Sequence, residues 1–455
     1  MDQARQAQEC HPRRARERGV VLILVLWVIV ILSTMTLAFT HQTQLAAKMA
    51  GFQSDSLRAD LIAKAGLRQA MILLREDLIK DHQESIERGA IYRYDPKDRY
   101  LYDAGNEAWA CSDDLYVDVE FAGGHYRVVV RDESAKLPLN NNAIPVESYQ
   151  RLLMTLGWRE KEAQAMAAAI MDWRDPDEDP SNSGDPSLRD TSSEAHYYNP
   201  RQNSRDIELN GPDYLCKNMN FSSPEELLMV RGITPVVFFG EDANKNGKLD
   251  RNESDGDRSY PPDNGDRILQ RALKDYVTVY SNEVNLNTAP FEVLYAILYP
   301  IQGDAAERTA ESIVAYRNGA DRIPYTKDDL PMRSLKNDDE DDIHFDKAAG
   351  VDQQLIDTLS SKIAKIRSDV FNVVALGEYQ NVQKGYHAVI ERDWVSEENL
   401  PQYGVDTEYV EDLEQVRLTV RVFEPIASAE SIFSQSIDRS TQRRAEREHR
   451  RGRRL

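Results

Sequence analysis

The chain has 455 residues with a formal net charge of -21, and 41% of its residues are hydrophobic. This length allows two or three domains, and the apolar content supports a packed core. Both ends are rich in arginine, so the long central part is more acidic than the chain as a whole. Such an acidic segment is unsuited to nucleic acid, whose binding depends on neutralising phosphates, and it suits the binding of cations.

The N-terminus combines a cluster of arginines with a long apolar run. Residues 20–39 are almost all apolar, and Gly19 stands directly before them. Four arginines lie ahead of this glycine: Arg13, Arg14, Arg16 and Arg18. The run can cross a bilayer as one helix, with the arginines on the cytoplasmic side. A secretory signal peptide would have a shorter apolar core and a cleavage site after it; an ordinary single-pass signal anchor remains the alternative.

This order of arginines, glycine and apolar run resembles the leader of type IV prepilins and pseudopilins. The resemblance implies that the prepilin peptidase cleaves between Gly19 and Val20 and leaves a methylated N-terminus. The fifth mature residue is then Leu24, where pilins and most pseudopilins carry a glutamate. A carboxylate is costly in hydrocarbon unless it is paired, and the resemblance implies that in pilins this glutamate pairs with the N-terminal amine of the preceding subunit. Its absence suits a subunit with nothing ahead of it, and resembles the minor pseudopilin K of type II secretion systems.

The helical pattern continues beyond the apolar run without proline to about Asp81. Apolar residues at mostly three- and four-residue steps predict one helix face: Leu45, Met49, Phe52, Leu57, Leu61, Ile62, Met71, Ile72 and Leu78. Together with the anchor this predicts one helix about 90 Å long at 1.5 Å per residue. A membrane helix that continues into an amphipathic stem is the spine of the pilin fold.

Strand patterns lie on both sides of a long helical region. Residues 115–121 and 126–131 predict a hairpin that turns at Ala122-Gly123-Gly124. Two strands alone are marginal in water, and their expected partners are 369–375, 386–391 and 416–423. The predicted fold is therefore α+β: a pilin-like long N-terminal helix packed on an antiparallel sheet, with a large, mostly α-helical domain inserted between strands.

The expected division of the chain follows from these patterns. It is a leader (1–19), a transmembrane helix (20–40), an amphipathic stem helix (41–82), a first part of the α/β domain (83–133), an inserted helical domain (134–365), a second part of the sheet (366–430) and a basic, disordered tail (431–455).

The inserted segment contains a weak internal repeat. Leu139-Asn140 and Leu286-Asn287 each precede two apolar helical patterns, which end near Arg174 and Arg317. Each unit predicts a turn that opens a helical hairpin. Asn140 and Asn287 are expected to be helix N-caps, because asparagine side chains accept hydrogen bonds from unpaired amides there.

The most specific local motif is residues 242–253, which fit the calcium-loop pattern D-x-[DN]-x-[DN]-G-x5-E. Gly247 permits the sharp turn, and six residues are the expected ligands of a structural calcium ion: Asp242, Asn244, Asn246, Lys248 through its carbonyl, Asp250 through a water and Glu253. No flanking helices are evident, so a lone calcium loop is expected. The alternative is an acidic turn without metal.

Other candidate sites are weaker. Asp175, Asp177 and Asp179 belong to an acidic cluster at a helix end, which suits either a second calcium ion or a solvated loop. Cys111 and Cys216 remain after cleavage, and the sequence leaves open a disulfide or two thiols. Catalytic patterns such as GxSxG, HExxH, a P-loop or CxxC do not occur, so no enzymatic activity is expected.

Further motifs extend the resemblance to pseudopilin K over the whole chain: Leu139-Asn140, Asp172-Trp173-Arg174-Asp175-Pro176-Asp177, Tyr197-Tyr198, Glu226-Leu227, Val284-Asn285-Leu286-Asn287, Ser368-Asp369-Val370-Phe371 and Val389-Ile390-Glu391-Arg392. The family implies a minor pseudopilin at the tip of the periplasmic pseudopilus, anchored in the bacterial inner membrane, with the minor pseudopilins I, J and H as partners. Calcium binding is also known in the family.

Two alternatives come from other classes. One is a minor type IV pilin. The other is a DNA-binding protein, because the stretch at 285–289 also resembles the helix-hairpin-helix domain of competence proteins. That motif needs a Gly-x-Gly hairpin, whereas residues 299–303 contain one glycine and the surrounding charge is acidic.

Overall fold

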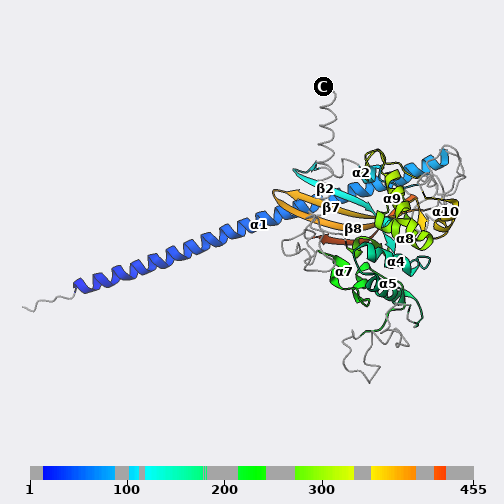
Figure 1. Ribbon diagram of the computed structural model, residues 1–455. Coiled ribbons are helices and arrows are strands. Elements are labelled where there is room, and N and C mark those ends of the chain that lie inside the picture. Colours follow the sequence, from blue (N-terminus) through cyan, green and yellow to red (C-terminus); the bar gives the residue numbers. More distant parts are fainter. Residues whose placement is uncertain are drawn as a thin grey trace, which may run out of the picture.

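A single helix dominates the computed structural model, which describes residues 14–87, 102–111, 118–177, 179, 181, 214–241, 272–332, 350–395 and 415–426. This helix, α1 (Arg14–Glu87), has 74 residues and projects far beyond the rest of the molecule (Figure 1). At 1.5 Å per residue it is about 110 Å long. The predicted continuous anchor-and-stem helix is confirmed, and it begins earlier and ends later than expected.

The described strands form the predicted antiparallel sheet. Its order is β1-β2-β7-β8-β9, with β1 (Val119–Phe121), β2 (Gly124–Asp132), β7 (Val370–Tyr379), β8 (Val382–Trp394) and β9 (Val416–Ile426). The first strand is shorter than predicted, and residues 112–117 lie outside the described part. The connection between β2 and β7 spans the whole helical insertion, so the predicted α+β fold is confirmed.

Two tight turns fix the register of the sheet. The β1–β2 turn is Ala122-Gly123, with φ of 51° and 81°. The β7–β8 turn is Gln380-Asn381, with φ of 46° and 67°. Positive φ at both central residues is the geometry that matches the twist of two-residue hairpins. The hairpin expected at 122–124 is therefore confirmed.

The stem packs on the sheet through a face that differs from the predicted one. Seven apolar side chains of α1 are buried: Ala59, Ile62, Ala63, Leu67, Ala70, Leu74 and Leu78. Most of them meet Val128 and Val130 of β2, Phe371 and Val373 of β7 and Ile390 of β8 in one core. Most residues of the predicted face are instead exposed: Leu45, Met49, Phe52, Leu57, Leu61 and Ile72. Three of the seven buried residues are alanines, which allow close approach to the strands, and Leu45, Met49 and Phe52 lie before the buried stretch begins at Ala59.

The inserted domain consists of short helices and connecting segments. Its helices are α4 (Val146–Thr155), α5 (Glu160–Arg174), α7 (Pro235–Phe239), α8 (Phe291–Gln302), α9 (Ala306–Arg317) and α10 (Gln353–Ser360). Two short parallel pairs brace it, β3 (Leu137–Pro138) with β4 (Val277–Thr278), and β5 (Val284–Asn285) with β6 (Ala364–Lys365). The buried apolar residues of this domain form a core of their own, separate from that of the stem and sheet.

The two predicted helical hairpins have matching contacts. Nη1 of Arg174, the last residue of α5, donates to the carbonyl of Leu139 over 2.6 Å. Nη1 of Arg317, the last residue of α9, donates to the carbonyl of Leu286 over 2.8 Å. A buried arginine therefore closes each unit on the segment that opens it, which supports an internal duplication.

The two asparagines of the repeat are not N-caps, contrary to the prediction. Pro145 and Pro290 occupy the cap positions of α4 and α8. Asn140 instead exchanges two hydrogen bonds with the backbone of Phe221, over 2.8 and 3.0 Å. Asn287 makes the equivalent pair with Met332, over 2.8 and 3.0 Å. Each side chain thus satisfies a distant backbone segment.

The turn of the second hairpin also lies later than expected. Helix α8 continues through Pro300 to Gln302, and the turn is the 3-10 segment η7 (Gly303–Ala305), with φ of 59° at Gly303. A proline within a helix removes one amide donor.

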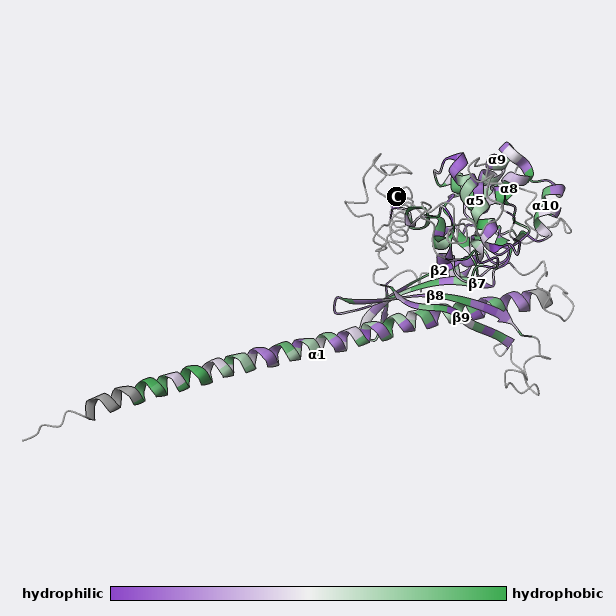
Figure 2. Ribbon diagram, turned by 90° about the horizontal axis from the view of Figure 1, so that it is seen from below, coloured by the Kyte–Doolittle hydropathy of each residue, from purple (hydrophilic) through white to green (hydrophobic). Residues whose placement is uncertain are grey.

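The inserted domain joins the sheet at the end farther from the apolar half of α1. On the nearer side, Arg58 of α1 donates to the Tyr379 hydroxyl beside the β7–β8 turn. At the far end, Arg392 of β8 donates to the carbonyl of Leu74, farther along α1. Asp132 pairs with Phe371 at this same end, where the chain leaves β2 and returns to β7. Figure 2 shows α1 on one side of the sheet and the helical domain on the other.

Candidate functional site

The N-terminal residues singled out from the sequence lie in α1. Gly19 and Val20 are near the start of this helix, and the structure describes the side chains of the helix from Val21 onward. Leu24 is 61% exposed, and the neighbouring apolar side chains to Phe39 are exposed as well. A helix that is apolar all round needs surroundings other than water. This helix is long and apolar enough to cross a membrane, and it is a candidate membrane anchor.

The predicted calcium loop, with Asp242, Asn244, Asn246, Lys248, Asp250 and Glu253, lies outside the described residues. A short helix precedes it, although the sequence suggested none. This helix, α7, ends at Phe239, and its C-cap Gly240 has a φ of 68°. The metal in this loop remains a prediction.

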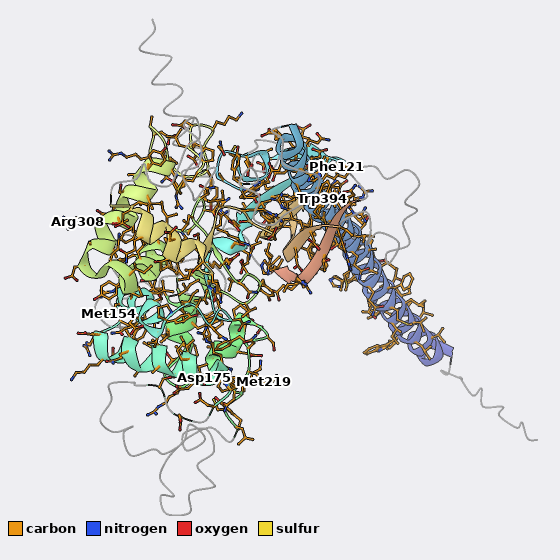
Figure 3. All side chains as sticks on the ribbon, turned by 90° about the vertical axis from the view of Figure 1, so that its right-hand side faces the viewer. Phe121, Met154, Asp175, Met219, Arg308 and Trp394 are labelled. Atoms are coloured by element: carbon orange, nitrogen blue, oxygen red, sulfur yellow. The ribbon has the colours of Figure 1, made fainter. Side chains whose placement is uncertain are left out.

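The second acidic cluster forms a turn held by its own side chains. The Asp177 carboxylate accepts from the backbone of Asp179 over 3.0 Å, and Asp172 accepts from the backbone of Ser181 over 2.8 Å. Burial, followed by the charges of Asp177 and Asp172, raises the pKa of Asp175 to about 6. Figure 3 shows Asp175 at the edge of the helical domain, far from Trp394 on the sheet. A second calcium ion here also remains a prediction.

The two cysteines do not form the disulfide that the sequence left open. The Cys111 sulfur donates to the carbonyl of Asn106 over 3.3 Å, in the segment beside the stem. The Cys216 sulfur donates to the carbonyl of Asp172 over 3.4 Å, in the helical domain. The two thiols therefore have separate partners in separate parts of the fold.

The most strongly built polar site is a junction that the sequence did not reveal. Arg392 is fully buried between the stem and the segment around α2 (Ala108–Cys111). Its guanidinium donates to Asp77 of α1 over 2.7 Å, to the carboxylate of Asp103, and to the carbonyl of Ser368 over 3.3 Å. Its plane also lies over the ring of Phe371, 4.7 Å from the centroid.

A second set of contacts ties this junction to the inserted domain. Nδ2 of Asn285 is 3.0 Å from the carbonyl oxygen of Asp103 and 2.9 Å from the Asp132 carboxylate. Asp132 also accepts from the hydroxyls of Thr288 and Ser368. All five side chains are buried. Buried polar groups of this kind stabilise a fold only when their hydrogen bonds are complete, so they fix the stem, sheet and insertion in one arrangement.

The junction holds several carboxylates in a poorly solvated space. Burial raises the pKa of Asp103 to about 7, although Arg392 opposes the shift. Burial likewise raises the pKa of Asp77, and it raises that of Asp81 and Glu107 well above their usual range. Conversely, these carboxylates raise the pKa of Arg392 against the effect of its own burial. The guanidinium is therefore charged, and the surrounding acids compete for it.

Sequence reasoning missed this site because its members are far apart in the chain. Asp77 belongs to the stem, Asp103 to a loop and Arg392 to β8, the fourth described strand of the sheet in chain order. The one available signal was Arg392 itself, a charged residue two positions after the apolar Ala388-Val389-Ile390 of this strand. Such a residue is rarely buried unless it is paired.

These features define the structural class of the protein. The fold is a pilin-like α+β fold, with an exposed apolar half of a long N-terminal helix and a large helical domain at the opposite end. Residues 128–238 match the family described as type II secretion system (T2SS), protein K.

Known proteins agree with this match. Type II secretion system protein K of Pseudomonas aeruginosa is 26% identical over 227 residues, which cover 48% of this chain and 58% of that protein. Its namesake from Klebsiella pneumoniae is 23% identical over 229 residues, covering 49% and 60%. The chain thus spans about three fifths of the length of these relatives. The resemblance to protein K that the sequence indicated is confirmed.

One solved structure was also similar in outline. It is the crystal structure of the GspK-GspI-GspJ complex of the type 2 secretion system from enterotoxigenic Escherichia coli. The similarity has a TM-score of 0.43 and 12% sequence identity, and it covers 83% of this chain and 99% of the other.

Proposed function

We propose that this protein is a minor pseudopilin at the tip of a type II secretion pseudopilus, with a structural role in protein secretion across the outer membrane. The observation that carries the proposal is the position of the inserted domain. It joins the sheet where Asp132 pairs with Phe371, at the end away from the apolar half of α1. A further subunit stacked beyond this end would collide with the domain, so the subunit terminates a fibre and does not extend it.

The proposed partners are the minor pseudopilins I, J and H, and the surface offered to them is the stem. Five large apolar side chains of α1 are exposed: Leu45, Met49, Phe52, Leu57 and Leu61. An exposed apolar row of this kind marks an interaction surface. We place the anchor in the inner membrane and the C-terminal domain in the periplasm, because arginines before the apolar run favour a cytoplasmic N-terminus.

The proposal is tested by deleting the protein and measuring type II secretion of an exoprotein. Secretion should stop in the deletion strain and return with the wild-type chain. The full-length protein, purified in detergent, should form a discrete complex with the I and J subunits and stay monomeric alone. Unimpaired secretion after deletion, or open-ended polymers of the protein by itself, would overturn the tip assignment.

We further propose processing of the chain by prepilin peptidase between Gly19 and Val20. Mass spectrometry of the membrane protein should find a methylated N-terminus at Val20. Gly19→Leu should leave the leader in place, because a bulky side chain does not fit a site shaped for glycine. A matched control is Gly51→Ala, whose added carbon meets no atom within 4 Å and which should be processed normally. Detection of an intact Met1 start beside active peptidase excludes the cleavage.

We also propose one structural calcium ion in the loop at 242–253. Glu253→Gln removes the bidentate ligand and Asp242→Ala the first ligand, so both should weaken binding. An ion that binds only the folded state stabilises it by a few kcal/mol at saturation, which should raise the melting temperature of the wild-type protein. A melting temperature that rises equally in wild type and Glu253→Gln would show that the loop is not responsible.

A further inference from the structure

The buried junction contains more negative than positive charge. Asp77, Asp81 and Asp103 are 9%, 5% and 0% exposed, and the Glu107 carboxylate lies beside them. Arg392 contributes a single positive charge to this group through its pairs with Asp77 and Asp103. Taking charges out of water is costly unless each one is compensated. One guanidinium does not balance four carboxylates, so the junction as described is suited to a further cation.

The spacing of the carboxylates fits one metal ion. Asp77, Asp103 and Glu107 each place an oxygen within 4.8 Å of the other two. Calcium holds its oxygen ligands at about 2.3–2.6 Å, so two ligands of the same ion lie at most about 5 Å apart. Three carboxylates from two separate parts of the chain, α1 and the segment at 102–111, therefore converge at a separation that a single calcium ion can bridge.

A second observation points to a ligand at the same place. Oδ2 of Asp81 is buried and has no hydrogen-bond donor. Asp81 lies one helical turn after Asp77, and its charge is close enough to Asp77, Asp103 and Glu107 to interact with all three. A buried carboxylate oxygen without a hydrogen-bond partner has lost its hydration without a compensating interaction. A cation in the cluster would offset the negative charge of this carboxylate as well.

We propose that Asp77, Asp103 and Glu107 bind a divalent cation of the calcium type, with the buried carboxylate of Asp81 next to the site. All the ligands are carboxylate oxygens, which suits a hard cation. Calcium accepts an all-protein shell, whereas magnesium retains several waters that a buried site does not accommodate. This site is distinct from the loop at 242–253 and does not depend on the proposed function.

The ion would lock the stem to the rest of the fold. Asp77 belongs to α1, whereas Asp103 receives hydrogen bonds from the backbone of Ser368 and, at its carbonyl, from Asn285 of the inserted domain. Metal at this point therefore couples the position of the stem to that of the helical domain.

Terbium provides a local probe, because it occupies calcium sites and emits when a nearby indole is excited. Trp109 donates to the Glu107 carboxylate over 2.9 Å, so its ring lies next to the proposed ion. The experiment uses the full-length protein in detergent. The Glu253→Gln and Asp242→Ala changes are present so that the loop at 242–253 does not bind terbium. Excitation of tryptophan should give saturable terbium emission that calcium displaces.

Matched variants locate the signal. Glu107→Gln retains an acceptor for Ala104 and Trp109 but removes the charge, and it should weaken terbium binding at least tenfold. Asp77→Asn should act in the same direction. Asp60→Asn is the control, because this stem carboxylate binds Lys64 and Tyr386 away from the junction, and it should leave terbium binding unchanged.

Metal content of the loop-silenced protein gives an answer even if the junction variants fail to fold. About one calcium per chain after dialysis supports the site. Absence of bound calcium, or terbium emission that Glu107→Gln leaves intact, overturns it. A melting temperature that is unchanged by calcium and by chelator, but falls as pH rises from about 5 to 8, would show that the carboxylates hold protons and not a metal ion.

Discussion

Arg392 holds more of the fold together than any local pattern suggested. Its guanidinium contacts the stem through Leu74 and Asp77, and the loop before α2 through Asp103. Removing one partner of a buried ion pair costs about 3–5 kcal/mol, because the other charge stays buried without compensation. Here several carboxylates would be left in that state.

Arg392→Met should therefore lower the free energy of unfolding by about 3–5 kcal/mol at neutral pH. The pKa of Asp103 is raised to about 7 even beside Arg392. An acid with a raised folded-state pKa favours the fold below its unfolded pKa of about 4 and loses this contribution as pH rises through about 7. The cost of Arg392→Met should thus be smaller at pH 5, where the acids can take up protons, than at pH 8.

Chemical denaturation in calcium-free buffer at both pH values measures this difference. Arg421→Met is the control, because Arg421 is 54% exposed and pairs with Glu391 at the surface. Such a pair contributes at most about 1 kcal/mol. Equal losses for Arg392→Met at the two pH values would contradict the role assigned to the buried acids.

Single residues also show where sequence reasoning ends. Asparagine is a frequent N-cap, so Asn140 and Asn287 were expected there, yet their partners are the backbones of Phe221 and Met332. These partners lie 81 and 45 residues away. Residue preference describes local structure, and contacts of this length depend on how the elements are packed.

At the scale of elements, strands and helices followed from periodicity and turn residues. The five strands were predicted from their apolar patterns and, for the first hairpin, from the turn at Gly123, whose positive φ that hairpin requires. The buried face of the stem was not correctly predicted, because large apolar residues were given more weight than alanines. Ala59, Ala63 and Ala70 are fully buried, whereas Phe52 and Leu61 are exposed.

Close packing of stem and sheet should make Gly377 irreplaceable. A Cβ at this position of β7 would lie 2.3 Å from the Ala63 nitrogen and 2.4 Å from the Ala59 carbonyl oxygen. Both are backbone atoms of α1, which cannot turn aside as a side chain can. Gly377→Ala should therefore push the helix away and destabilise the fold by about 1–3 kcal/mol or more.

Gly51→Ala is the matched change on the same helix, where an added carbon meets open space. It should be neutral or stabilise by up to about 1 kcal/mol, because alanine favours a helix more than glycine does. Thermal unfolding of the two purified variants makes the comparison. A tolerated Gly377→Ala would mean that the stem does not lie this close to β7 in solution.

At the scale of the whole molecule, two apolar cores meet across a polar junction. One core belongs to the stem, α2 and the sheet, and the other to the inserted domain. The insertion begins and ends at neighbouring positions of β2 and β7. Separate cores joined mainly by buried hydrogen bonds are expected to unfold as two cooperative units.

Calorimetry of the full-length protein should therefore show two transitions. Leu153→Ala lies in the core of the inserted domain and Val373→Ala in that of the sheet, and both side chains are fully buried. Leu→Ala at such a site costs about 2–5 kcal/mol, so each change should lower one transition more than the other. A single transition that both variants shift equally would show that the two units unfold together.

The unbroken length of α1 has a mechanical consequence. The helix grips the sheet at two levels along its axis, by backbone contact at Gly377 and by the ion pairs of Arg392 nearer its C-terminal end. Two contact points on one helix prevent α1 from tilting against the sheet as well as from sliding along it. A force or torque applied at the apolar end of α1 should therefore be transmitted through the helix and the sheet to the helical domain.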